Sequence, residues 1–130
     1  MKSFKTARYI KVALINATLL LLTVFLLPLS TNAKDVTFQW TAVPEPLTGY
    51  RLYYNSGGTG GPPWVGTELS QGASPILVGK VTSYTVTGLL EDETYHFVLT
   101  AFNENGESGQ SAMVTVSPQD APVIINITVQ

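Results

Sequence analysis

Few residues of this chain have side chains that could carry out chemistry. His96 is the single histidine among 130 residues, and a catalytic histidine needs a nucleophile or an orienting partner that no motif here supplies. We expect His96 to be an ordinary surface residue on the outward face of a strand. The acidic run Glu91 to Glu93 indicates a solvated turn, because calcium takes about six to eight oxygen ligands in a fixed arrangement. The sequence therefore predicts no catalytic residue and no metal site.

The chain contains no cysteine, and this absence excludes further kinds of site. It excludes disulfides, thiolate zinc sites and a thiol nucleophile. Gly57, Gly58, Gly60 and Gly61 do not indicate a phosphate-binding loop, since no helix follows whose N-terminus could hold a phosphate. We therefore expect no cofactor and no enzyme activity, and we interpret the glycines as a flexible loop.

The rest of the chain shows the periodicity of strands. Tyr95, Phe97 and Leu99 recur at every second position, which places them on one face of an extended segment, with His96 and Val98 on the other. Similar alternation occurs over 35–41, 50–54 and 83–87, and polar, glycine-rich or proline-rich segments separate these runs. The residues predicted to be buried together are Trp40, Tyr50, Leu52, Tyr84, Val86, Leu89, Tyr95, Phe97 and Leu99.

Several of these segments resemble parts of a fibronectin type III domain. Thr87-Gly88-Leu89, with Tyr95 six residues after Leu89, is similar to the corner between the family's E and F strands, and Gly106-Glu107-Ser108 is similar to its FG loop. The resemblance covers residues 35–118 and implies an all-β, immunoglobulin-like sandwich of about seven strands. It also implies a tyrosine corner, in which the Tyr95 hydroxyl bonds to backbone upstream.

The resemblance assigns the strands as well. B, C, C′, E and G correspond to residues 35–41, 50–54, 75–79, 83–87 and 112–116, and F begins at Tyr95. Two features depart from the family pattern. The strand A that should precede B is reduced or absent, and Glu91 stands where the corner usually has a proline.

The C-terminal segment, residues 119–130, lies beyond the last strand of the family. Val123, Ile125, Ile127 and Val129 fall on one face of an extended chain, which predicts an extra strand. We expect this strand to pair with the domain's own open edge, either beside G or in the vacant A position, where it would run parallel to B. The alternative is strand-mediated self-association or donation to another protein.

Residues 1–33 have the composition of an export signal. Four basic residues precede an apolar run from Val12 to Leu29, and a small residue, Ala33, ends the segment. We expect cleavage there, which leaves a domain at 34–118 in the periplasm, at the cell surface or outside the cell, and the pattern resembles that of bacterial exported proteins. The alternative is an uncleaved membrane anchor. The remaining chain has three basic residues against nine acidic ones, which argues against nucleic acid as a partner.

With catalysis, metal binding and cofactor binding not predicted, the function that we expect is binding to another macromolecule. The predicted partner-binding residues are Trp64, in the loop after strand C, together with Tyr53, Val98, Phe102 and Met113 on the outward side of strands C, F and G. The alternative is that Trp64 folds back and covers the apolar part of that surface. We predict an exported, non-catalytic module for protein binding or structural spacing. The alternative is a carbohydrate-binding or enzyme-accessory protein that stacks Trp64 and Tyr53 on sugar rings.

Overall fold

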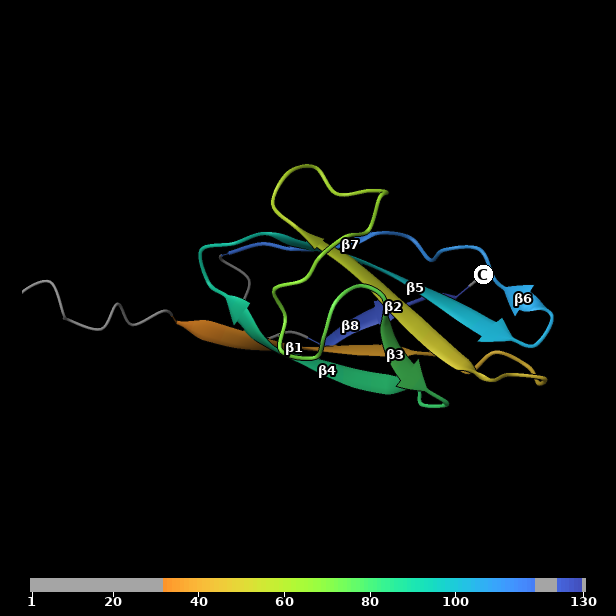
Figure 1. Cartoon of the computed structure of the whole chain (residues 1–130). Coiled ribbons are helices and arrows are strands. Elements are labelled where there is room, and N and C mark those ends of the chain that lie inside the picture. The colour runs from red at the N-terminus through yellow and green to blue at the C-terminus, as the bar shows by residue number, and fades with distance from the viewer. Residues whose placement is uncertain (1–31, 119–123, 130) are drawn as a thin grey trace, which may run out of the picture. The chain divides into compact units, whose positions relative to one another are not determined.

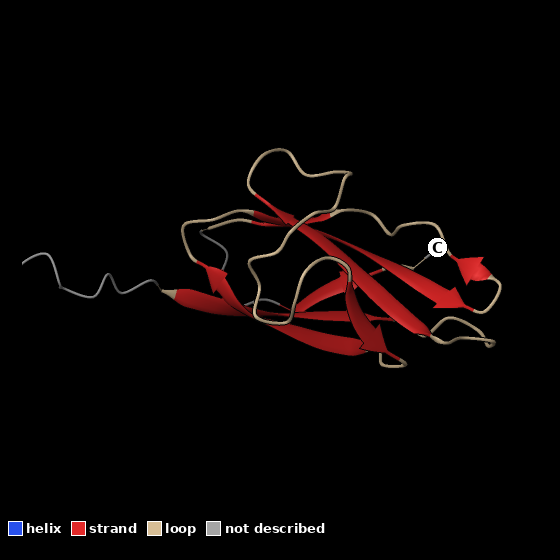
Figure 2. Cartoon of the chain, viewed as in Figure 1, coloured by secondary structure: helices blue, strands red, loops and turns tan. Residues whose placement is uncertain are grey.

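The computed structural model describes residues 32–118 and 124–129, and these residues contain eight strands joined by loops (Figure 1, Figure 2). In chain order the strands are β1 (Ala33–Trp40), β2 (Gly49–Ser56), β3 (Ile76–Gly79), β4 (Ser83–Leu90), β5 (Tyr95–Asn103), β6 (Gly106–Glu107), β7 (Val114–Val116) and β8 (Ile124–Ile127). Within these residues there is no helix long and apolar enough to cross a membrane. The expected export signal, residues 1–33, falls almost entirely on residues 1–31, which lie outside the described residues.

The strands form two sheets that pack face to face. The smaller sheet has the order β4-β1-β8, and the larger has the order β3-β2-β5-β6, with β7 also paired to β5. Phe38 of β1 and Phe97 of β5 meet between the sheets, with ring centroids 4.8 Å apart. The predicted all-β sandwich is therefore confirmed. The sequence did not predict β6, a short strand formed where Gly106 and Glu107 pair with the end of β5.

The core lies between the inward faces of the two sheets. The predicted core residues that are buried are Trp40, Tyr50, Leu52, Val86, Leu89, Tyr95, Phe97 and Leu99. Tyr84 differs from the prediction, since it is only partly buried and packs against the margin of the core. It lies on β4, at the edge of the smaller sheet, where one flank of a large side chain is open to solvent.

The predicted tyrosine corner is present between β4 and β5. The hydroxyl oxygen of Tyr95 accepts a hydrogen bond from the backbone N–H of Leu90 at 3.3 Å. The Tyr95 ring is buried and stacks near Phe97, with centroids 6.3 Å apart. The side chain therefore closes the turn into β5 and packs into the core at the same time.

The C-terminal strand β8 covers an edge of its own domain. It pairs in parallel with β1, with Phe38 opposite Ile125 and Trp40 opposite Ile127. Ile127 is 5% exposed and belongs to the core, and Ile125 and Val129 pack against that core. The extra strand was thus predicted correctly, and it lies beside β1 where strand A was expected to be missing. Residues 119–123 and 130 of the same segment lie outside the described residues.

The long connection between β2 and β3 has no strand but is tied to the sandwich. The Tyr54 hydroxyl accepts a hydrogen bond from the Leu69 N–H at 3.2 Å and donates one to the Gly72 carbonyl at 2.9 Å. Leu69 itself is buried in the core. Gly66 lies so close to Tyr54 that an added Cβ would stand 2.2 Å from its ring. The second half of the connection is therefore part of the folded domain.

Candidate partner-binding face

The side of the larger sheet that faces away from the core, which we call the outer face, carries most of the residues predicted to contact a partner. Alternate residues of β2 and β5 point to it, among them Arg51 and Tyr53 from β2 and Thr100 and Phe102 from β5. Strand pairing places Arg51 between Leu77 of β3 and Thr100 of β5. The register therefore brings side chains from three strands onto one surface.

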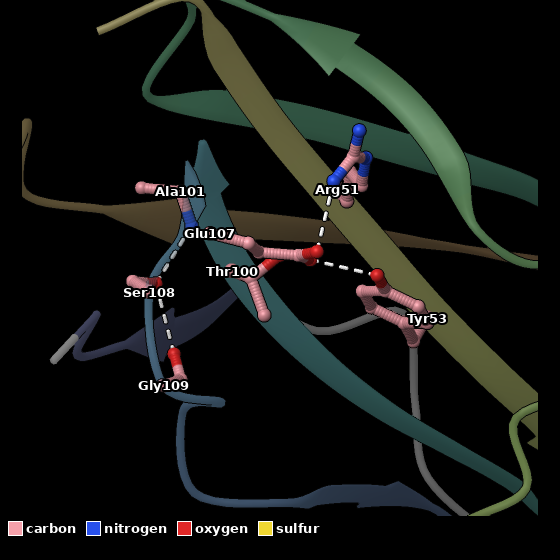
Figure 3. A network of polar contacts seen from close by, with 7 residues as sticks. All are labelled: Arg51, Tyr53, Thr100, Ala101, Glu107, Ser108 and Gly109. Carbon is pink, nitrogen blue, oxygen red and sulfur yellow. Dashed lines mark hydrogen bonds and ion pairs between the residues drawn. The ribbon is translucent and has the colours of Figure 1, made fainter. Parts of the chain in front are cut away.

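A single carboxylate organises the centre of the outer face (Figure 3). Glu107 accepts a hydrogen bond from the Tyr53 hydroxyl at 2.7 Å and pairs with the Arg51 guanidinium at 2.8 Å. The Thr100 hydroxyl donates to the same carboxylate. Burial acts to raise the pKa of Glu107, but the hydrogen bonds and the charge of Arg51 outweigh it and lower that pKa. Burial and the neighbouring carboxylate raise the pKa of Tyr53, so its hydroxyl remains a donor.

Phe102 is held beside this cluster. The guanidinium carbon of Arg51 lies 4.1 Å from the Phe102 ring centroid, which is cation–π geometry. Phe102 also lines a cleft of 540 Å³ between the loop before β2 and the turn between β5 and β6. Pro44, Pro46 and Leu47 form part of the opposite wall. The half-buried Phe102 therefore contributes to a concave surface as well as to the outer face.

Val98 is not exposed on the outer face, contrary to the prediction. Only 2% of the residue is exposed. It lies opposite Tyr53 in the pairing of β2 with β5, and β5 has neighbouring strands on both sides. Val98 therefore offers almost no surface of its own on the outer face.

His96 is also buried, although the sequence predicted a surface residue. It is 4% exposed, because the first part of the loop after β2 lies over it. Its Nε2 donates to the Gly58 carbonyl at 3.2 Å, and its Nδ1 accepts from the Thr115 hydroxyl at 3.0 Å. A carbonyl oxygen can only accept, which assigns the ring proton to Nε2. No group of three or more His, Asp or Glu side chains in the described residues could hold a metal ion, and the role of His96 is to hold the loop.

The covering loop is fixed at several points. The Asn55 amide donates to the carbonyls of Gly61 and Pro63 at 2.9 and 2.8 Å, and its oxygen accepts from the Val65 N–H at 2.6 Å. In Figure 1 the loop is the yellow-green segment that rises beside β7. The loop is therefore folded onto the outer face at the end near β7.

Trp64 and Met113 are placed by this loop. Trp64 is half-buried, and its indole nitrogen is buried without a hydrogen-bond partner among the described residues. The sulfur of Met113 would lie 2.6 Å from a Cβ built on Gly60, so the loop rests on this side chain, yet Met113 remains 45% exposed. The loop that carries Trp64 therefore lies against Met113 and His96 through Gly60, and it leaves Trp64 and Met113 partly accessible.

Two exposed apolar residues of this region were not predicted. Leu77 on β3 is 68% exposed and points away from the core between buried Ile76 and Val78. The run Ile76-Leu77-Val78 is apolar throughout, so its sequence does not show which of the three side chains faces outward. Val65, in the loop, is 66% exposed, and no periodic pattern surrounds it that would have shown its orientation.

Comparison with known proteins gives two findings. A sequence profile described as fibronectin type III domain matches residues 27–117. The Kelch domain-containing protein SSO1033 of Saccharolobus solfataricus is 35% identical to this chain over an aligned length of 98 residues, and the match covers 67% of this chain and 13% of that protein. The chain therefore spans only a small part of the length of that relative.

Proposed function

Because the chain belongs to the fibronectin type III family, we propose that it is an exported, non-catalytic module that binds another protein through the outer face of its larger sheet. A fibronectin type III domain is a module of the binding or spacing kind, and such domains are generally non-catalytic. Fold alone does not name a partner, so the argument for binding comes from the surface.

This proposal rests mainly on large apolar side chains that are exposed on one side of the domain. Within the described residues, Leu77, Val65 and Met113 are 68%, 66% and 45% exposed, and all three lie on or beside the outer face. Single exposed apolar residues are ordinary, whereas contiguous apolar patches mark contact surfaces in soluble proteins, and we take these three residues as the apolar part of such a surface. A partner protein would remove this apolar area from water.

The aromatic side chains of the same face are held in place before any partner arrives. Tyr53 is tied through its hydroxyl to Glu107, and Phe102 is stacked on Arg51. Ordering a free side chain on binding costs about 0.5–1.5 kcal/mol, so rings that are already fixed avoid part of that cost. The pairing of Arg51 with Glu107 also leaves the centre of the face without net charge, which suits a partner surface that is apolar and uncharged.

Export is the second part of the proposal, and it is supported by residues 1–33. Basic residues followed by an apolar run and small residues are typical of a cleaved signal peptide. We place the mature domain in the periplasm, at the cell surface or outside the cell. Sequencing the N-terminus of the protein recovered from its host tests this: a mature N-terminus at Lys34 agrees with it, and a retained Met1 in the cytoplasmic fraction contradicts it.

Binding through the outer face is tested by capture of the partner from the host envelope. The variant Leu77→Ser/Met113→Ser removes exposed apolar groups from the face. The control Val81→Ser/Leu90→Ser removes the other large exposed apolar residues of the described part, which lie elsewhere. Leu77 is mostly exposed, but Met113, Val81 and Leu90 keep more than half of their surface covered. Urea unfolding therefore first establishes that both double variants remain folded under the capture conditions. We expect the face variant to lose the captured protein and the control to keep it.

Other outcomes of the capture experiment have defined meanings. Equal retention by the face variant and the wild type overturns the outer face as the contact surface. A complete absence of captured protein favours the spacing role. Binding to a polysaccharide that is lost on Trp64→Ala favours the carbohydrate-binding alternative for this face.

A further inference from the structure

The strand β3 forms one edge of the larger sheet, and its sequence is apolar throughout. It pairs with β2 on one side and, within the described residues, with no strand on the other. Its first three residues are Ile76, Leu77 and Val78, and neither a charged residue nor a proline occurs in the strand. Charged side chains and prolines are the usual means by which an edge strand prevents another strand from adding to it. The edge formed by β3 has neither.

The main-chain groups of Leu77 face the open side of β3. On the far side of the sheet, the Leu99 N–H donates to the Ser111 hydroxyl and the Leu99 carbonyl accepts from the Ser111 N–H, both at 2.9 Å. Opposite residues of an antiparallel pair either bond to each other or both point away, so Leu52, which lies opposite Leu99, directs its N–H and C=O toward β3. There it is paired with Ile76. Main-chain groups alternate along a strand, and those of the next residue, Leu77, therefore point away from β2.

Leu77 therefore presents three groups at this edge. Its N–H and its carbonyl have no hydrogen-bond partner among the described residues. Its side chain is 68% exposed, more than any other large hydrophobic side chain in the described part of the chain. A strand laid along this edge would pair with both main-chain groups and remove part of the side chain from water.

We propose that β3 binds an extended segment of the partner protein, which joins the larger sheet as a further antiparallel strand. This inference rests on the proposed function, because Leu77 belongs to the outer face, and it states how the partner is held. The partner residue opposite Leu77 exchanges two main-chain hydrogen bonds with it, and its side chain lies on the outer face with the two Cβ atoms about 4.5–5.5 Å apart. An apolar residue, such as valine or isoleucine, suits that position.

The edge is short, which favours a partner segment over a second copy of this chain. The register of β3 with β2 shifts after Leu77, and Gly79 has a φ of 75°, which is outside strand geometry. Four residues of strand span about 14 Å. A stable dimer buries about 1,200–2,000 Å², much more than two such strands could bury side by side. A segment of another protein is not limited in this way, because it can pair with β3 and continue across the outer face.

Hydrogen exchange of the Leu77 amide in the ¹⁵N-labelled full-length chain tests this mode of binding. The probe is a heptapeptide with blocked ends in which threonine and valine alternate, used at millimolar concentration. A valine opposite Leu77 directs its N–H to Leu77, so methylating the valine nitrogens removes the donors on that edge of the peptide. Methylating the threonine nitrogens affects the other edge only. We expect the unmodified and threonine-methylated peptides to slow exchange of the Leu77 amide in a saturable manner, and the valine-methylated peptide to bind about tenfold more weakly.

Substitutions in the chain separate the side chain of Leu77 from its main chain. Leu77→Ala keeps the amide, so the peptide should still slow its exchange, but with an affinity about fivefold lower. Gln110→Ala changes an exposed residue elsewhere and should leave the affinity unchanged.

Three results would overturn the proposal: no slowing of Leu77 exchange by the unmodified peptide, equal binding of the two methylated peptides, or slowing that depends on chain concentration alone, which would mean that β3 pairs with a second copy. The capture experiment stays independent of these. If the face variant loses the captured protein while the peptide leaves the Leu77 amide unaffected, the outer face binds through side chains without an added strand, and the proposed function stands without this inference.

Discussion

Shortening one side chain of the C-terminal strand should destabilise the whole domain. Ile127 is 5% exposed and packs in the core through the pairing of β8 with β1. Ile127→Ala removes three carbon atoms, worth about 0.8 kcal/mol each in transfer free energy, or about 2.4 kcal/mol together. The cavity left behind adds to this, although an edge strand can move inward to fill part of it, so we expect a loss of about 2–4 kcal/mol. That is a large share of the roughly 5–15 kcal/mol typical of a small domain.

Urea unfolding followed by tryptophan fluorescence measures this loss. With a denaturant slope of about 1–1.5 kcal/mol/M for a domain of this size, the midpoint should fall by about 1.3–4 M. Asn126→Ala is the matched control, because it changes the adjacent, exposed residue of the same strand and should alter stability by less than about 0.5 kcal/mol. Coinciding midpoints for Ile127→Ala, Asn126→Ala and the wild type would refute the packing of β8 into the core.

Three further predictions concern the corner, the covering loop and the outer face. Tyr95→Phe removes the hydroxyl of the tyrosine corner and should lower the free energy of unfolding by about 0.5–1.5 kcal/mol, which urea unfolding would detect as a shifted midpoint. Gly60 and Gly58 both have positive φ, at 73° and 61°, but only at Gly60 would an added Cβ meet close neighbours. Gly60→Ala should therefore push the loop off the face and red-shift the fluorescence emission of Trp64. Gly58→Ala should change that emission less. The partners of Glu107 lower its pKa below 4.5, so its ionised form stabilises the fold above about that pH and the contribution disappears as the pH falls through the lowered pKa. Glu107→Gln should accordingly flatten the acid side of a plot of thermal midpoint against pH, and an unchanged slope would contradict this role.

The parts of the fold that depend on local pattern could be predicted from the sequence. Strict alternation identified the inward residues of β1, β2 and β5, and the spacing between Leu89 and Tyr95 identified the corner. The alternating apolar residues of the tail predicted a strand with one buried side. The expected absence of strand A left the edge of β1 open, and β8 pairs there. Strand ends were less certain, since β4 continues to Leu90 and β7 begins only at Val114. Chain length and side-chain pattern do not specify where a ladder stops pairing.

The outer face could be predicted only in part, because its exposure depends on a loop without periodicity. Alternation correctly placed His96 on the side of β5 away from the core, but could not show that the Gly58 carbonyl and Gly60 would cover it. Val98 was misjudged for a related reason, since burial in mid-sheet depends on the size of neighbouring side chains. The cluster around Glu107 arises from β6, a two-residue strand that the sequence suggested only as a turn.

Site-specific photo-crosslinking in the living host tests the proposed binding face most directly. A photoreactive amino acid at Leu77 lies on the outer face, and the same amino acid at Thr85 lies on the exposed side of the other sheet. Irradiation followed by denaturing electrophoresis shows which position touches another protein. We predict a discrete protein adduct from position 77 and none from position 85. An adduct from position 85 alone, or equal adducts from both positions, would contradict the assignment of the outer face as the partner-binding surface.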